Sequence, residues 1–526
     1  MPSRHQQPDA AIELNNEFRR ALDVMEHTLR HVFVTGRAGT GKSTLLEYFR
    51  AHTAKKIAVL APTGVAALNV RGQTIHSFFR FRPDVTYLAI RRVQPRQRAL
   101  YEKLDAVVID EISMVRSDLF DCIDRFLQLN GPRRNHPFGG MQLICIGDLY
   151  QLPPVVTGAE RAMFKLRYPS PYFFDAEAFL ALNPEFVELE KIYRQTDAAF
   201  IKILNAVRTR SVGDADLALL TKRVQPDFEP PPEELYVRLV PTNDLARSLN
   251  ERALGRLKAK AAVFRGTLEG DFREKDLPTE LTLTLKESAQ VMFVHNDHAR
   301  RWVNGTIGRV VEIGRTRGGS DAEILVELPD GGVVSVSPHT WELFRYVYNE
   351  REKHLDTETI GSFTQYPLRL AWALTIHKSQ GKTFDRVIVD MGRGAFAHGQ
   401  VYVALSRCRS LEGLVLVKPI ERRHILFDWA IVKFLTAFQY ARAEGALSLA
   451  DKQKMIAAAI AAKKRLEITY LKTNNEKSRR VIAPTEIGKM RYEGKEFLGV
   501  RAYCFERNDE RVFRIDRILE ILQTQP

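Results

Sequence analysis

The chain has 526 residues, of which 45% are hydrophobic and 27% are charged. This length and composition predict several domains with buried cores and exclude a disordered chain. Lys and Arg outnumber Asp and Glu by 78 to 64, and this basic excess favours a polyanionic partner such as nucleic acid over a surface that is basic only for solubility. The four cysteines form no CxxC pair, which argues against a zinc site or a disulfide framework. Without an apolar run of 18 residues or a signal-peptide core, we expect a cytoplasmic protein that does not enter membranes.

The first half of the chain alternates apolar strands with helical stretches. Nearly continuous apolar runs predict strands at 31–36, 56–63, 105–110 and 141–148. Strands of this kind are buried on both faces of a parallel sheet, and the helices between them imply βαβ units. An Arg-rich stretch from about 78 to 100 looks like a small insertion.

The second half begins after a Pro-rich break at 226–234, where a new strand at 235–243 is predicted. Gly-bounded short strands from about 281 to 355 predict a small β-barrel. Strand-like runs return after residue 369, so the barrel is expected to be inserted in a second α/β lobe. A basic unit, 451–526, ends the chain.

The segment GRAGTGKS (36–43) is a phosphate-binding motif between a predicted strand and a predicted helix. Gly36, Gly39 and Gly41 let the backbone N–H groups face phosphate oxygens at the positive end of the helix. Lys42 would bridge the β- and γ-phosphates, and Ser43 would bind Mg²⁺.

Two further segments complete a hydrolytic site. VVIDE (107–111) ends a buried strand with two carboxylates, of which Asp110 would hold Mg²⁺ and Glu111 would act as general base. GDLYQLPPV (147–155) places Gln151 at a strand end, where it could sense the γ-phosphate. The alternatives are solvated acids and a strand ended by prolines.

Eight ordered motifs carry a family resemblance. In chain order they are the phosphate loop, APTGVAA, TIHSFF, VIDEISM, GDLYQLPPV, IYRQ, LTIHKSQGKTFD and VYVALSRCRS. Over residues 12–430 the chain resembles superfamily 1 helicases of the Pif-one/RecD-like branch, and HPFGGMQLICIGDLYQLPPV resembles the signature segment of the Pif-one family.

The resemblance implies an α/β fold with two RecA-like domains. We expect the first at 1–183, with a strand-separating insertion at about 78–100, and the second at 184–285 and 356–440. An SH3-like β domain is expected at 286–355. The implied activity is ATP-dependent, 5′-to-3′ DNA unwinding, with ATP and Mg²⁺ as cofactors and roles in DNA repair, recombination and telomere maintenance.

The resemblance also implies functional residues. Two arginines of the second lobe, Arg194 and Arg407, would reach the γ-phosphate. The full set of predicted ATP-binding residues is Gly36, Ala38, Gly39, Thr40, Gly41, Lys42, Ser43, Thr44, Gln151, Arg194, Gly381 and Arg407. The predicted contacts to single-stranded DNA are Pro62, Thr63, Gly64, Thr74, His76, Ser77 and Phe78 in the first lobe and Thr242, Asn243, His377, Lys378 and Ser379 in the second. A core role is the alternative for His76 and Phe78.

Two segments depart from the family patterns. Family members often carry a glutamine in LxxEQ that contacts adenine, but LNNEF (14–18) has Phe18 there. Residues 451–526 resemble a WYL domain, an SH3-like unit of bacterial regulators, although Glu496, Phe497 and Leu498 replace the naming tripeptide. Such domains bind negatively charged ligands, so Arg491, Arg501, Arg514 and Arg517 are candidate contacts. The alternative is a charged face on a packing module.

The sequence therefore predicts a bacterial, nucleoid-associated helicase that acts on single-stranded DNA and on tailed or forked duplexes. We expect a monomer in solution, with an oligomer on DNA left open. Two alternatives are a translocase that remodels nucleoprotein without separating strands, and a WYL-type DNA-binding regulator in which ATP only switches a binding state.

Overall fold

The structure is a computed structural model that describes residues 14–523, except 196, 273, 275–276, 298, 316–321, 350–353, 393, 395–396, 474–476 and 493–494. The outer ends of the predicted first and last domains, and part of the predicted barrel, lie outside the described residues. The chain forms two compact units: one holds residues 1–204 and 214–426, and the other holds 205–213 and 427–526.

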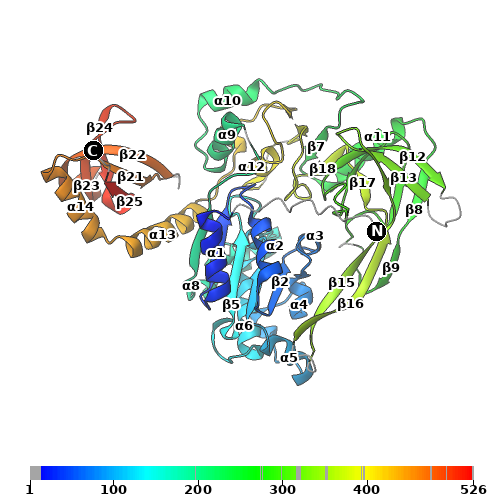
Figure 1. The fold of residues 1–526 in the computed structure, drawn as a ribbon, viewed down its shortest axis with the longest axis horizontal. Coiled ribbons are helices and arrows are strands. Elements are labelled where there is room, and N and C mark those ends of the chain that lie inside the picture. Colours follow the sequence, from blue (N-terminus) through cyan, green and yellow to red (C-terminus); the bar gives the residue numbers. More distant parts are fainter. Residues whose placement is uncertain are drawn as a thin grey trace, which may run out of the picture. The chain divides into compact units, whose positions relative to one another are not determined.

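The first unit begins with a six-stranded parallel sheet in the order β3-β2-β4-β5-β1-β6. Its strands are β1 (Val32–Gly36), β2 (Ile57–Ala61), β3 (Gln73–Thr74), β4 (Ala106–Ile109), β5 (Gln142–Gly147) and β6 (Glu185–Leu189). Figure 1 labels β2 and β5 of this sheet. The four central strands β1, β2, β4 and β5 are almost wholly buried, as their continuous apolar sequences predict. The range 184–285 was expected to lie in the second lobe, but β6 pairs with β1 and belongs to the first sheet.

Helices connect these strands. They are α1 (Asn16–His27), α2 (Lys42–His52), α3 (Gly64–Asn69), α4 (Ile75–Phe79), α5 (Pro95–Glu102), α6 (Ser117–Asn130), α7 (Gly158–Lys165) and α8 (Glu177–Leu180). Apolar residues of α1 and α2 form one core with the strands beneath them. The Arg-rich insertion contains a short turn, η1 (Tyr87–Ala89), and α5.

A second parallel sheet of four strands follows in the first unit, in the order β18-β7-β19-β20. Within this unit, we call the six-stranded sheet with its helices the first lobe and the four-stranded sheet with its helices the second lobe. Its strands are β7 (Val237–Val240), β18 (Ala373–Thr375), β19 (Val387–Val389) and β20 (Leu414–Leu416). The helices of this part of the first unit are α10 (Asp214–Thr221), α11 (Asn243–Arg256) and α12 (Gln400–Leu405). α9 (Ala198–Arg208) begins in the first unit and ends in the second. This mixed α/β architecture with parallel sheets confirms the predicted fold class.

A β-rich region interrupts the second sheet between β7 and β18. Its strands are β8 (Ala262–Arg265), β9 (Thr267–Gly270), β10 (Thr282–Leu285), β11 (Gln290–Phe293), β12 (Ile307–Arg315), β13 (Ala322–Glu327), β14 (Val333–Val336), β15 (His339–Asn349), β16 (His354–Gln365) and β17 (Leu368–Leu370). They form antiparallel sheets of five, three and two strands. The region is therefore wider than the expected range 286–355.

The second unit contains a five-stranded antiparallel sheet in the order β24-β23-β22-β21-β25. Its elements are α13 (Trp429–Ala446), α14 (Leu449–Ala461), β21 (Leu466–Leu471), β22 (Lys477–Tyr492), β23 (Lys495–Cys504), β24 (Asp509–Arg514) and β25 (Ile518–Gln523). α14 shares a core with the sheet. Among the described residues, no helix has the length and apolarity needed to cross a bilayer.

Candidate nucleotide cleft and nucleic-acid edges

The loop 36–43 joins β1 to α2 and lines a cleft of about 770 Å³. Gly39 and Gly41 have φ angles of 82° and 87°, which residues with a side chain rarely adopt. The Nζ of Lys42 donates hydrogen bonds to the carbonyl oxygens of the first two loop residues, at 2.8 and 2.9 Å. A cation and the N-terminus of α2 thus meet at one cleft, an arrangement that suits a phosphate.

Most of the predicted ATP-binding residues line this cleft. Those that do are Ala38, Gly39, Gly41, Lys42, Ser43, Thr44, Gln151, Arg194, Gly381 and Arg407. The predicted general base Glu111 lines it as well. Gly36 instead ends β1, and Thr40 is buried with its hydroxyl donating to the Arg37 carbonyl at 2.9 Å.

The acids Asp110 and Glu111 follow β4. Burial raises the pKa of Asp110, and burial together with the Asp110 charge raises the pKa of Glu111, while Lys42 lowers both. The Nε2 of Gln380, from the second lobe, donates a hydrogen bond to Glu111 Oε2 at 3.0 Å. Asp110 is buried and Glu111 is half-buried, and hard oxygen ligands of this kind, together with the exposed Ser43, fit a Mg²⁺ ion.

Arg407 enters the cleft from the second lobe and is only 1% exposed. Its Nε donates to the Val403 carbonyl at 2.9 Å, Nη1 to the Lys382 carbonyl at 3.1 Å, and Nη2 to Ser406 Oγ at 2.8 Å. Burial, with repulsion from Arg194, lowers the pKa of Arg407 to about 9. The guanidinium is therefore charged at neutral pH and already oriented.

Arg194 was expected to come from the second lobe. It instead follows β6, the edge strand of the first sheet, and the preceding residue Tyr193 donates its backbone N–H to the Gly39 carbonyl at 2.8 Å. The Nη2 of Arg194 donates to the Gly381 carbonyl at 3.1 Å, and burial lowers the pKa of Arg194. Arg194 thus joins the phosphate loop to the second lobe.

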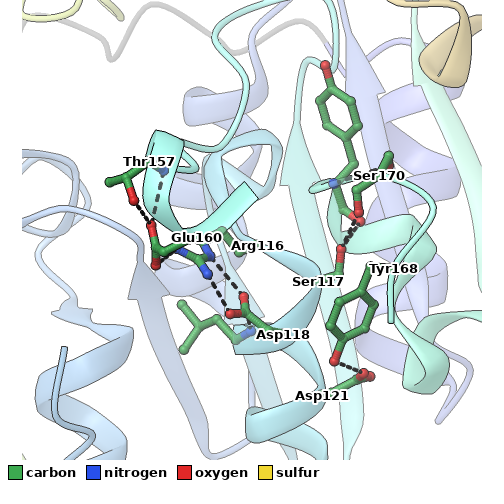
Figure 2. A network of polar contacts seen from close by, with 10 residues as sticks. Arg116, Ser117, Asp118, Asp121, Thr157, Glu160, Tyr168 and Ser170 are labelled. Atoms are coloured by element: carbon green, nitrogen blue, oxygen red, sulfur yellow. Dashed lines mark hydrogen bonds and ion pairs between the residues drawn. The ribbon is translucent and has the colours of Figure 1, made fainter. Parts of the chain in front are cut away.

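Gln151 is 6% exposed after β5, and its Nε2 donates to Asp148 Oδ2 at 3.2 Å. The segment that follows is fastened to α6 by a network of polar contacts (Figure 2). Arg116 binds Asp118 and Glu160, and Thr157 donates to Glu160 through its hydroxyl and its backbone N–H, at 2.6 and 3.0 Å. Hydrogen bonds from Thr157 and Arg116 lower the pKa of Glu160 to about 2.

The nucleic-acid contacts predicted in the first lobe gather at the carboxyl ends of β2 and β3. Gly64, Thr74, His76 and Ser77 line one hollow of about 470 Å³, and Pro62 and Thr63 immediately precede the helix that begins at Gly64. The predicted stacking role of Phe78 is wrong for this conformation. Its ring is 3% exposed and packs edge-on against Phe79, Tyr101 and Tyr346, which is the core alternative.

Of the contacts predicted in the second lobe, some residues likewise lie at a hollow and one is buried in the core. Asn243 and Lys378 line a hollow of about 650 Å³, Thr242 caps the helix at its edge, and burial lowers the pKa of His377 and Lys378. Ser379 is fully buried and its hydroxyl donates to the Ile376 carbonyl at 2.8 Å, so the predicted DNA contact by this side chain is wrong for this conformation.

The candidate arginines of the C-terminal unit differ in availability. Arg491 is exposed and Arg517 is half-buried. Arg501 pairs with Glu486 at 3.1 Å, and Arg514 binds both carboxylate oxygens of Asp516. Arg491 and Arg517 are therefore the better placed of the four for an external anion.

Comparisons with known proteins agree with this geometry. Residues 13–216 match the family model of the PIF1-like helicase, residues 370–417 that of the UvrD-like helicase C-terminal domain, and residues 452–522 that of the WYL domain. The chain is 34% identical over 443 residues to the ATP-dependent DNA helicase Pif1 of Bdellovibrio bacteriovorus, and this match covers 82% of the chain and 94% of that protein.

The chain belongs to the PIF1-like helicase family. It is 36% identical to human ATP-dependent DNA helicase PIF1 over 404 residues, which are 73% of the chain and 57% of the human protein. Unliganded Pif1 from Bacteroides superposes with a TM-score of 0.73 at 35% identity, covering 81% of the chain and 97% of that protein. The TM-score is 0.59, at 36% identity, for Bacteroides Pif1 bound to ssDNA. These findings confirm the predicted family, the helicase enzyme class and the WYL domain.

Several residues that line or touch the helicase cleft were not predicted as site residues. Gln380 reaches Glu111, Tyr193 and Arg409 line the cleft, and Tyr402 accepts a hydrogen bond from the phosphate loop. Gln380, Arg409 and Tyr402 lie inside the motifs LTIHKSQGKTFD and VYVALSRCRS, so each could have been singled out there. Only the folded chain shows which of these side chains cross to the first lobe.

Proposed function

We propose that this PIF1-family member is an ATP-driven motor that moves 5′ to 3′ along single-stranded DNA and separates tailed or forked duplexes. The observation that carries the proposal is the convergence, in one cleft, of a phosphate loop, the acid Glu111 and two arginines, with the buried Asp110 next to Glu111 in the chain. One of these arginines, Arg407, comes from the second lobe. Phosphoryl chemistry can therefore be coupled to movement between the lobes.

In the proposed reaction, the loop 36–43 and Lys42 bind the β- and γ-phosphates. Mg²⁺, held by Ser43 and Asp110, would neutralise phosphate charge. Glu111 takes a proton from a water molecule while the water oxygen bonds to the γ-phosphorus. The bond between the γ-phosphorus and the β–γ bridging oxygen breaks, and ADP leaves. Gln151 senses the γ-phosphate, and Arg194 and Arg407 stabilise the charge of the transferring phosphoryl group.

As contacts to single-stranded DNA we propose Pro62, Thr63, Gly64, Thr74, His76, Ser77, Thr242, Asn243, His377 and Lys378. Hydroxyls, amides and a lysine hold phosphates without reading bases, so weak sequence preference and strong salt dependence are expected. Related structures support contacts to DNA, since Bacteroides Pif1 has been solved bound to ssDNA, and another Pif1 structure concerns unwinding at forked dsDNA by two coordinating helicases. We expect this chain to be a monomer in solution.

The insertion at 78–100 is the proposed strand-separating element. Leu88 on η1 is 80% exposed, and the segment that follows this turn is held by the fully buried Asn130. The side-chain oxygen of Asn130 accepts from Val93 N at 2.9 Å, and its Nδ2 donates to the Arg91 carbonyl at 3.3 Å. An exposed apolar side chain on a fixed turn can press against a terminal base pair.

For the WYL domain we propose nucleic-acid binding or regulation of the motor. Residues 451–526 hold 17 Lys and Arg against 11 Asp and Glu, a local excess of +6. This excess supports an anionic ligand, with Arg491 and Arg517 as contacts. A charged face used only for packing would contribute nothing to DNA affinity.

The test is ATP turnover with and without short oligonucleotides, paired with unwinding of duplexes that carry a 5′ or a 3′ tail. We expect DNA-stimulated hydrolysis and unwinding of the 5′-tailed substrate alone. Glu111→Gln is the control, because it should bind nucleotide but not turn over. Movement without strand separation would favour the translocase alternative, and turnover that ignores polynucleotide would refute the proposal.

A further inference from the structure

Helix α12 touches the phosphate loop through a tyrosine hydroxyl. The backbone N–H of Ala38, inside the loop, donates a hydrogen bond to Tyr402 Oη at 2.9 Å. Tyr402 is 4% exposed and Ala38 is 6% exposed. Because both groups are buried, this bond is a defined polar contact from the second lobe to the loop that would hold the phosphates.

The beginning of α12 lies against the loop that follows β5 and carries Gln151. Its N-cap, Gly399, has a φ of 73°, and a Cβ there would lie 2.4 Å from the backbone oxygens of both Tyr150 and Gln151. Real Cβ atoms do not approach backbone oxygen so closely, so only glycine fits between the helix and this loop. The helix start is thus packed directly on the residues that carry the proposed γ-phosphate sensor.

Arg407 follows the end of α12 by two residues. Its three nitrogens donate to Val403, Ser406 and Lys382, all in the second lobe. The guanidinium is therefore fixed relative to α12. Its distance from a phosphate bound by the first lobe depends on how α12 is held against that lobe.

We propose that Tyr402 is a positioning residue for Arg407. Its hydroxyl, bound to the Ala38 N–H, sets the position of α12 on the phosphate loop and so places the guanidinium for the γ-phosphate. The inference rests on the proposed hydrolysis at this cleft. It predicts that Tyr402 affects turnover of ATP but not binding of ADP, which lacks the phosphate that Arg407 would reach.

The variant Tyr402→Phe removes the hydroxyl and keeps the ring. In the full chain with saturating single-stranded DNA, we expect kcat for ATP to fall about fivefold, the effect of one lost hydrogen bond. The affinity for a fluorescent ADP analogue should stay within twofold of wild type. The matched control is Tyr366→Phe, which removes another buried hydroxyl, bonded to the Ala322 carbonyl in the β-rich region, and should leave kcat unchanged.

A double variant separates positioning from general stability. If Tyr402 acts through Arg407, adding Tyr402→Phe to Arg407→Ala should cause no further loss in single-turnover hydrolysis of radiolabelled ATP. An unchanged kcat in Tyr402→Phe, an equal loss of ADP affinity, or full additivity with Arg407→Ala would each overturn the inference. A wild-type chain whose turnover does not respond to DNA would instead overturn the proposed function, and this inference with it.

Discussion

Replacing Arg407 with alanine should separate catalysis from stability. A guanidinium that stabilises a transferring phosphoryl group contributes roughly 10³–10⁵ in rate in other NTPases. Three hydrogen bonds orient Arg407 before nucleotide arrives, so we expect kcat to fall at least a thousandfold, or about 4 kcal/mol of transition-state stabilisation. Arg407→Lys should be nearly as slow, because one ammonium cannot reproduce a fork held at three nitrogens.

The same substitution should change thermal stability little. Burial lowers the pKa of Arg407 to about 9, which means that the folded state disfavours this charge by several kcal/mol. Alanine removes that cost but also removes the hydrogen bonds that Lys382 and Ser406 accept, at about 1–3 kcal/mol each, whereas the Val403 carbonyl keeps a hydrogen bond from Ser406 Oγ at 3.0 Å. Because these effects offset, we expect the melting temperature to shift by only a few degrees. A loss of kcat below tenfold, or a loss that follows unfolding in calorimetry, would refute the reasoning.

The remaining predictions concern four other sites. Lys42→Ala should abolish DNA-stimulated ATP hydrolysis with an unchanged circular dichroism spectrum, and near-normal turnover would contradict the assignment. Since Phe18 lines the cleft where an amide would read adenine, kcat/KM for ATP and GTP should differ by less than about tenfold, whereas a much larger preference would show that another group reads the base. Burial lowers the pKa of Lys382 to about 8, so the folded state binds this proton less tightly than the unfolded chain does. The free energy of unfolding should therefore rise between about pH 8 and 10.5. Lys382→Met should flatten that rise in urea titrations. Arg491→Ala with Arg517→Ala, in the full chain, should weaken single-stranded DNA binding and reduce the salt slope by up to about two, and identical titration curves would leave the WYL domain without a role in binding.

The phosphate chemistry could be predicted from sequence because it depends on local patterns. A Gly-rich loop between an apolar strand and a helix has few other structural solutions, and the acids Asp110 and Glu111 follow a strand whose apolar run is unbroken. Parallel strands place such ends at one edge of the sheet, so the cleft itself could be expected.

The direction of single side chains could not be predicted in the same way. Phe78 and Ser379 lie in segments that reach the proposed DNA edge, yet both point into the core, and no periodicity exists in such short segments to show it. The width of the β-rich region was missed for a related reason. β8 and β9 are partly exposed strands in small sheets, so they lack the apolar run by which the buried strands were found.

The partnership of strand β6 depended on contacts distant in sequence. Glu185–Leu189 could extend either sheet, and only its pairing with β1 places it in the first. Consequently Arg194 is attached to the lobe that holds the phosphate loop, and Arg407 is the arginine that must cross between lobes. Lobe closure should therefore matter more for Arg407 than for Arg194.

The two lobes present one threonine each in the same local geometry. Thr63 follows β2 with φ −124° and ψ 155°, and Thr242 follows β7 with φ −124° and ψ 151°. Each hydroxyl oxygen accepts a hydrogen bond from the backbone N–H three residues later, at 3.2 and 3.4 Å, and so caps a helix. Capping uses a lone pair and leaves the hydroxyl proton available for a phosphate oxygen. A structural role and the proposed nucleic-acid contact are therefore compatible at these positions. A motor whose two lobes hold one strand alternately would need an equivalent contact of this kind on each lobe.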